Sequence, residues 1–122
     1  MDKEELQQRS RTFAVQIRHL CERLMQKPTG RQAANQLLVA ATSTAANYRS
    51  ACRGRSRAEF IAKLGIVVEE CDESVHWLEY IGESGLMPPY EIAEHLDEAK
   101  QLRAIFAASY GTARRNNRGG KS

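Results

Sequence analysis

Residues 32–48 read QAANQLLVAATSTAANY and contain no Asp, Glu, Lys or Arg, although 27% of the residues in the chain are charged. A surface helix needs a charged or polar face toward water, so a helix without charges is usually covered on more than one side. Asn35, Gln36 and Asn47 argue against a membrane span, as does the shortage of consecutive apolar residues. The stretch therefore predicts a helix buried both in its own fold and against another copy of the chain. That points to an assembly rather than an enzyme.

Three reciprocal caps predict where helices start: Asp2 with Glu5, Thr29 with Gln32, and Ser56 with Glu59. Clusters of Gly and Pro at residues 27–30, 53–56 and 85–89 predict the breaks. The expected helices lie near residues 3–25, 30–52, 57–84 and 90–112, and no segment alternates like a strand.

Short connections favour antiparallel neighbours. We therefore expect an all-α, up-down antiparallel four-helix bundle over residues 1–113. Residues 114–122 are basic and rich in Gly and Asn, which predicts a disordered tail.

The predicted third helix carries two apolar stripes. One face holds Phe60, Leu64, Val67, Val68, Cys71, Val75 and Leu78 and faces core residues of the first and last helices such as Phe13, Ile17, Leu102 and Phe106. A second group, Ile66, Trp77 and Ile81, lies about 120–140° round the helix. A second stripe beside a charge-free helix suggests a seam between subunits; one broad apolar arc within a single bundle is the alternative. The predicted oligomer interface comprises Val39, Ser43, Ala46, Ile66, Trp77 and Ile81.

Charge is arranged in blocks along the chain. Residues 31–63 hold six basic groups against the lone Glu59, residues 64–99 hold ten acids and no Lys or Arg, and residues 100–122 hold six basic groups and no acid. Such blocks can pair helices within a bundle or subunits head to tail. Solvated faces that differ in sign are the alternative.

A basic cluster at the junction of the second and third helices is the best functional candidate. Its members are Arg49, Arg53, Arg55, Arg57 and Lys63, and the tail adds Arg114, Arg115 and Arg118. Several guanidinium groups around one turn could meet phosphates of RNA or DNA. The same arginines could instead pair with Glu69, Glu70 or Glu73 of a neighbouring subunit. Because no aromatic stacking platform is apparent, any nucleic-acid binding is expected to be weakly specific.

Residues 40–60, AATSTAANYRSACRGRSRAEF, and their continuation to Glu79 resemble the four-helix-bundle protein family, also called the 23S ribosomal RNA intervening-sequence or S23-like proteins. The resemblance covers essentially the whole chain, most specifically residues 36–86. It implies a bundle that associates into a ring-like homopentamer and has no catalytic activity. A related bundle is the accessory protein of diversity-generating retroelements and engages nucleic acid. The family's common form has an Ile-Ala-Glu-Gly-like run after the Asn, where Tyr48-Arg49-Ser50-Ala51 stands here.

Candidate chemistry is sparse. Glu73 and His76 have the Glu-x-x-His spacing of di-iron bundles, but there is no second such motif, and Glu91, His95 and His19 read as surface residues. Cys21, Cys52 and Cys71 are odd in number and widely spaced, which fits core positions in a reduced compartment. The sequence predicts no enzyme, no metal and no cofactor.

No apolar run follows Met1–Glu5, so we expect a cytoplasmic protein with no membrane association. The expected partners are further copies of the chain and RNA or DNA. A protein client docking on the acidic block 69–98 is the alternative.

Overall fold

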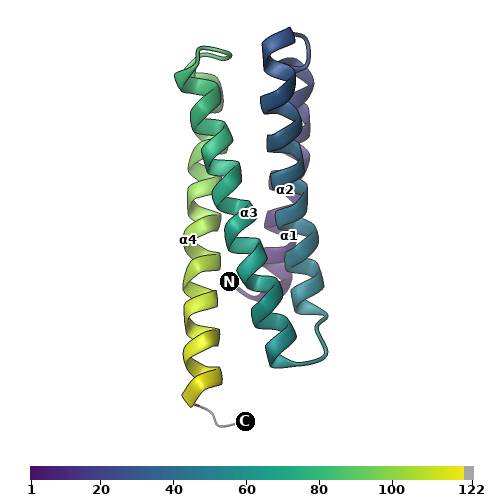
Figure 1. Cartoon of the computed structure of the whole chain (residues 1–122), viewed down its shortest axis with the longest axis vertical. Helices are drawn as coiled ribbons and strands as arrows, with labels where there is room; N and C mark the ends of the chain where they lie inside the picture. The colour runs from purple at the N-terminus through teal and green to yellow at the C-terminus, as the bar shows by residue number, and fades with distance from the viewer. Residues whose placement is uncertain (120–122) are drawn as a thin grey trace.

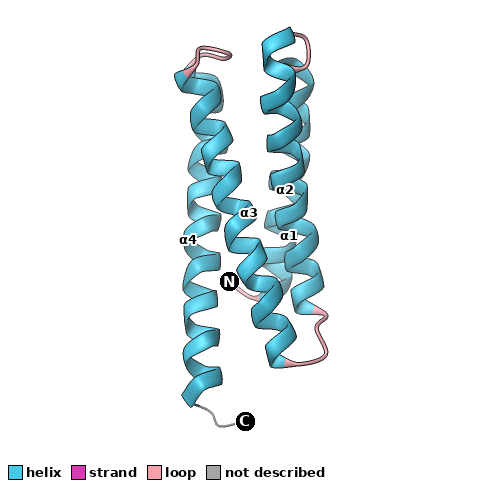
Figure 2. Cartoon of the chain, viewed as in Figure 1, coloured by secondary structure: helices cyan, strands magenta, loops and turns pink. Residues whose placement is uncertain are grey.

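The computed structural model describes residues 1–119, and these form four α-helices and no strands (Figures 1 and 2). The helices are α1 (Lys3–Leu24), α2 (Arg31–Cys52), α3 (Arg57–Glu83) and α4 (Pro89–Gly119), with a 3-10 turn, η1 (Pro28–Gly30), before α2. The predictions of an all-α fold and of four helices are confirmed. None of the four helices is long and apolar enough to cross a membrane.

One of the three predicted reciprocal caps forms completely, and a second forms in one direction only. The Asp2 side chain accepts from the Glu5 N–H at 2.8 Å, and the Glu5 side chain accepts from the Asp2 N–H at 3.1 Å. At the start of α3, Ser56 Oγ accepts from the Glu59 N–H. The Thr29 cap is wrong, because Thr29 lies inside η1 and Gly30 precedes α2 without a side-chain hydrogen bond. Pro28 fixes the backbone for this tight turn, which takes Thr29 out of the extended conformation that a cap requires.

The end of α3 is set by a glycine in the left-handed region. Gly85 has φ of 79°, and the Leu86 N–H donates to the Ile81 carbonyl at 3.2 Å. This hydrogen-bonding pattern satisfies carbonyls that the helix leaves free at its end, and glycine adopts the required φ without steric cost.

The last helix is longer than the sequence predicts. α4 continues to Gly119 instead of ending near residue 112, so Arg114 and Arg115 are helical and do not belong to a disordered tail. Residues 120–122 of the predicted tail lie outside the described residues.

The core lies between all four helices. The predicted core residues Phe13, Ile17, Leu64, Leu78, Leu102 and Phe106 are almost fully buried. Helix α2 buries small side chains along its length, including Ala33, Ala34, Ala40, Ala41 and Ala45, and the buried Thr44 hydroxyl donates to the Ala40 carbonyl. The charge-free helix is therefore covered within its own fold, which confirms that part of the prediction.

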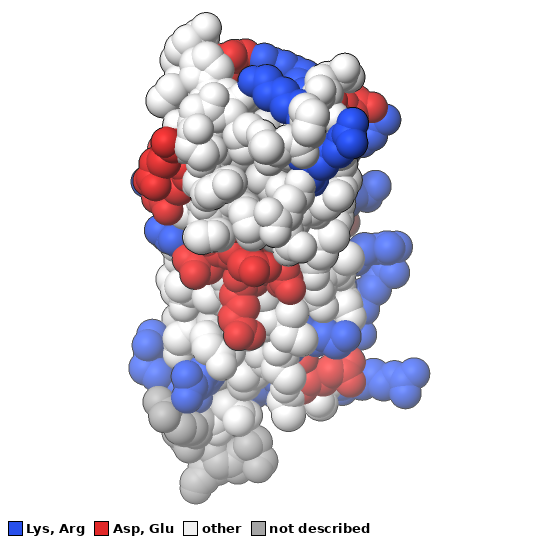
Figure 3. Space-filling view, turned by 45° about the horizontal axis from the view of Figure 1, so that its top comes forward, with Lys and Arg blue, Asp and Glu red and all other residues white. Residues whose placement is uncertain are grey.

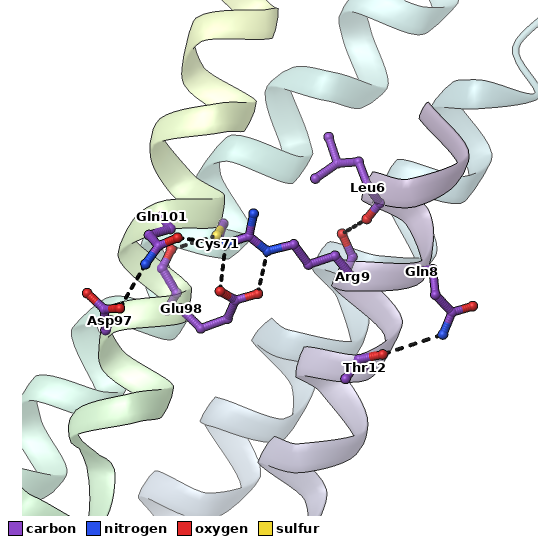
Figure 4. A network of polar contacts seen from close by, with 10 residues as sticks. Leu6, Gln8, Arg9, Thr12, Cys71, Asp97, Glu98 and Gln101 are labelled. Carbon is purple, nitrogen blue, oxygen red and sulfur yellow. Dashed lines mark hydrogen bonds and ion pairs between the residues drawn. The ribbon is translucent and has the colours of Figure 1, made fainter. Parts of the chain in front are cut away.

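Consecutive helices pack directly on one another, whereas α1 and α4 touch much less closely. Charged side chains bridge this weaker seam. Arg9 of α1 binds Glu98 of α4 through two hydrogen bonds of 2.7 Å and also donates to Gln101 at 2.8 Å (Figure 4). Arg23 pairs with Glu91 further along the same two helices. Two ion pairs also join α3 to α4, but there the helices pack closely as well, so ion pairs form a larger share of the α1–α4 contact.

Candidate nucleic-acid interface

The two basic clusters of the sequence meet at one end of the molecule. A pocket there is lined by Lys3 at the start of α1, by Arg57 at the start of α3, and by Asn116 near the end of α4. The α2–α3 turn, the start of α1 and the last turns of α4 therefore line one pocket, and all three lie in the lower half of the molecule in Figure 1. We call this end, with Lys3, Arg49, Arg53, Arg55, Arg57, Lys63, Arg114 and Arg115, the basic end.

The arginines of the α2–α3 turn are exposed to solvent. Arg53 is the C-cap residue of α2, Arg55 lies in the turn, and Arg57 is the first residue of α3. All three side chains are exposed, as is that of Arg49 one turn earlier, whereas Lys63 is half-buried. Cations at the end of α2 are favoured by the helix dipole, but cations at the start of α3 are opposed by it. The positions of Arg55 and Arg57 are thus not explained by helix stability.

Most arginines outside the basic end bind a carboxylate, whereas Arg11 and Arg31 form no ion pair within the described residues. Arg9, Arg18, Arg23 and Arg103 each bind a carboxylate. Within residues 1–117, none of Arg49, Arg53, Arg55, Arg57 and Lys63 forms an ion pair, although Glu59 lies beside Arg49 and Arg53. Arg114 lies over the Tyr110 ring, with its guanidinium carbon 5.3 Å from the ring centroid, and Arg115 donates to Thr112. Arg118 is in α4, and its side chain lies outside the described part of the chain.

Three acids on α3 also lack cations. Glu69 and Glu73 are exposed and Glu70 is half-buried, and none of them makes an ion pair within the described residues. Burial, and then the charges of Glu73 and Glu69, raise the pKa of Glu70. On the face drawn in Figure 3, a group of acidic side chains lies at mid-height, with basic side chains both above and below it. The alternative that arginines pair with a neighbour's α3 therefore stays open.

The predicted oligomer interface is only partly at the surface. Val39 is 62% and Ile66 41% exposed, Ala46 is exposed, and Ser43 is half-buried. Trp77 is half-buried against the core, and its indole N–H is buried without an acceptor among the described residues. Ile81 was placed wrongly: it is fully buried in the core cluster, because Met87 and Ile92 after the α3–α4 turn cover this end of α3. Ile81 cannot contact a second copy.

Comparison with known proteins places the chain in a family. Residues 2–108 match the family of 23S rRNA-intervening sequence proteins. The chain belongs to this family. The S23-like fold also appears in a crystal structure of a protein with unknown function from the S23 ribosomal protein family of Bacteroides thetaiotaomicron VPI-5482. The two sequences are 27% identical, with a TM-score of 0.81 over 86% of this chain and 97% of that one. No curated protein matches the sequence.

The titratable groups of this 23S rRNA-intervening sequence protein offer little chemistry. Burial raises the pKa of the Cys21 thiol to about 11 and that of Cys71 to about 12, and each thiol donates to a backbone carbonyl. Both cysteines are buried, as predicted, and Cys52 is half-buried. Glu73 and His76 are exposed, and residues 1–119 contain no group of three His, Cys, Asp or Glu side chains that could hold a metal.

Sequence reasoning missed Lys3 of the basic end and the neighbouring Phe60. Lys3 lies 4.5 Å above the centroid of the Phe60 ring, and both line the pocket with Arg57. The sequence did hold a signal for the meeting of the two basic clusters. When four helices are joined by short turns, the second connection and the end of the fourth helix lie at the same end.

Proposed function

We propose that this protein is a non-enzymatic scaffold, an up-down four-helix bundle that assembles into a homo-oligomer and contacts RNA or DNA through its basic end. The observation that carries the proposal is the set of exposed arginines without intramolecular carboxylate partners, drawn from two distant parts of the sequence. Clustered guanidinium groups repel one another, and phosphates relieve this repulsion while forming charge-assisted hydrogen bonds.

Assembly is supported by the apolar side chains that the bundle leaves at its surface. Val15 and Val39 on α1 and α2 are more than half exposed, and Ile66 and Tyr80 on α3 are each more than 40% exposed. A homopentamer is what the family resemblance implies. A ring would repeat the basic end in every subunit, so that modest contacts with one nucleic acid would add through multivalency.

The test is a fluorescence-anisotropy titration of the purified protein with a structured RNA and a duplex DNA across a salt series. Affinity should fall steeply with salt, because bound phosphates release counterions. The variant Arg53→Glu/Arg55→Glu should lose binding. The matched control is Arg18→Glu/Arg31→Glu, which changes the net charge equally near the opposite end of α1 and α2 and should bind normally. No binding by the unaltered protein at low salt would refute the proposal.

The second candidate is a protein–protein adaptor that docks a client on its acidic surface. The specific observation in its favour is that Glu69, Glu70 and Glu73 lie together on α3 without cations, with the pKa of Glu70 raised by burial and by its neighbours. The Arg53→Glu/Arg55→Glu variant should leave such a client bound, whereas Glu69→Gln/Glu73→Gln should release it. The two functions therefore respond to different variants.

A further inference from the structure

A pocket of about 670 Å³ opens in the basic end. It lies where the start of α1, the end of α2, the start of α3 and the last turns of α4 meet, so that all four helices contribute to its wall. Its volume falls within the range of about 300–1,000 Å³ that is typical of small-molecule sites. Ala108 and Asn116 at its edge are exposed, so the pocket is open to solvent.

The wall of this pocket combines three kinds of side chain. Lys3 and Arg57 supply positive charge and have no carboxylate partner within the described residues. Phe60 and several alanines supply apolar surface, with Lys3 lying over the phenyl ring. On the α4 side, Ser109 and Asn116 offer a hydroxyl and an amide that make no side-chain hydrogen bond elsewhere in residues 1–117. The pocket thus offers an apolar floor, free hydrogen-bonding groups and two cations.

We propose that this pocket takes an unpaired base of a single-stranded nucleic acid, with the adjoining phosphate held by Lys3 and Arg57. A base has apolar faces, a polar edge and an anionic phosphate beside it, which are the three features that the wall complements. Bases in a duplex are stacked and paired and cannot enter. The proposal rests on the nucleic-acid contact proposed above, and it narrows that contact from any RNA or DNA to single strands and loops.

The pocket adds one aromatic side chain to the basic cluster. Phe60 is half-buried at the same wall as Arg57, and Lys3 lies over its ring, so Phe60 supplies apolar surface rather than an open stacking face. The Ser109 hydroxyl and the Asn116 amide can each donate or accept a hydrogen bond, so they match the polar edge of any base. We therefore expect a preference for unpaired over paired nucleotides with little preference for sequence.

Cys52 provides a direct reporter of occupancy. Its half-buried thiol lines the pocket, whereas Cys21 and Cys71 are buried in the core, where burial raises their pKa values and keeps their thiols protonated. N-ethylmaleimide should modify Cys52 first, as mass spectrometry of peptides would show. A bound single strand should slow this modification, and the same sequence in a duplex should not.

A matched pair of substitutions tests the same point by affinity. Ala108→Trp places a large side chain at the pocket wall, whereas Ala107→Trp adds the same side chain at an exposed neighbour that does not line it. Because both alanines are exposed, both variants should fold, which circular dichroism checks. Ala108→Trp should weaken single-strand binding about tenfold and leave duplex binding unchanged, because the indole fills the space that the base would occupy while the arginines remain. Ala107→Trp should bind both as the unaltered protein does.

The outcomes separate this inference from the broader proposal. Equal affinity for single strand and duplex, with no protection of Cys52, would overturn the pocket while leaving the basic end as a nucleic-acid surface. A Cys52 that is unreactive in the free protein and becomes reactive on dilution to smaller assemblies would also overturn it, because a second copy would then fill the pocket. Failure of every probe to bind would overturn both.

Discussion

The Arg9–Glu98 ion pair should couple α1 to α4 by about 1–2 kcal/mol. Two parallel hydrogen bonds of 2.7 Å join the guanidinium to both carboxylate oxygens. The two side chains are only 25% and 27% exposed, so water screens the pair less than it would at an open surface. Exposed ion pairs contribute about 0.2–1 kcal/mol to the free energy of unfolding. Because the Arg9–Glu98 pair is bidentate and partly covered, we expect its contribution to lie at or above the upper end of this range.

The assay is a double-mutant cycle with Arg9→Met, Glu98→Gln and the combined variant, followed by urea unfolding at one fixed protein concentration. Each single variant leaves a partly buried charge without its partner. The two single losses in the free energy of unfolding should therefore add up to more than the loss in the combined variant. The loss should be largely recovered in the combined variant. A loss of 1 kcal/mol corresponds to a fall in melting temperature of about 4 °C for a domain of this size.

The control cycle is Arg103 with Asp72, which share one hydrogen bond of 2.7 Å and are 37% and 65% exposed. Its coupling should be no more than about 0.5 kcal/mol. A coupling for Arg9–Glu98 below about 0.3 kcal/mol, or one equal to the control, would refute the reasoning that α1 and α4 are held by this pair. Nucleic-acid affinity should be unchanged in Arg9→Met, because its charge is used within the molecule.

Three further predictions concern assembly, packing and pH. Trp77→Ala should yield smaller assemblies in analytical ultracentrifugation with unchanged helical circular dichroism; an unchanged mass would count against a seam at Trp77. Ala41 is fully buried on α2, so Ala41→Leu should overpack the helix contact and lower the free energy of unfolding in urea by about 1–3 kcal/mol. Burial lowers the pKa of His95, more strongly than Glu94 raises it. The unfolded chain then binds the proton more readily, so this contribution to stability should be lost as the pH falls below about 6.5. Melting curves should show a smaller acid-induced loss for His95→Gln; an identical loss would contradict the assignment.

Local signals in the sequence were sufficient for the helices themselves. Asp2 and Ser56 cap where the sequence predicts, because a cap depends on residues three positions apart. Thr29 has the same local pattern but fails, since Pro28 imposes a 3-10 turn on it. The predicted end of α4 is too early, because the basic, Gly- and Asn-rich composition of residues 114–122 is typical of a tail, whereas the helix continues through it to Gly119.

Features that depend on several helices were harder to predict. Ile81 lies off the main apolar face of α3, yet residues beyond the following turn bury it completely. A helical wheel describes one helix and cannot show what covers its end. The pocket has the same origin, because Lys3, Phe60 and Asn116 become neighbours only when four helices are packed together.

The arrangement of charge gives a physical reason to seek a partner at the basic end. Where Arg9, Arg23 and Arg103 serve the fold, each has a carboxylate on another helix. Arg55 and Arg57 stand near the start of α3, where the helix dipole opposes a cation by about 0.3–1 kcal/mol, and the arginines beside them add repulsion. Glu59 in the first turn of α3 forms no ion pair with these arginines, so an anion from outside the chain would stabilise the basic end. Phosphates of a nucleic acid and carboxylates of a neighbouring subunit could both supply this negative charge. Carboxylates alone would leave the apolar wall of the pocket, with its aromatic ring, without a partner.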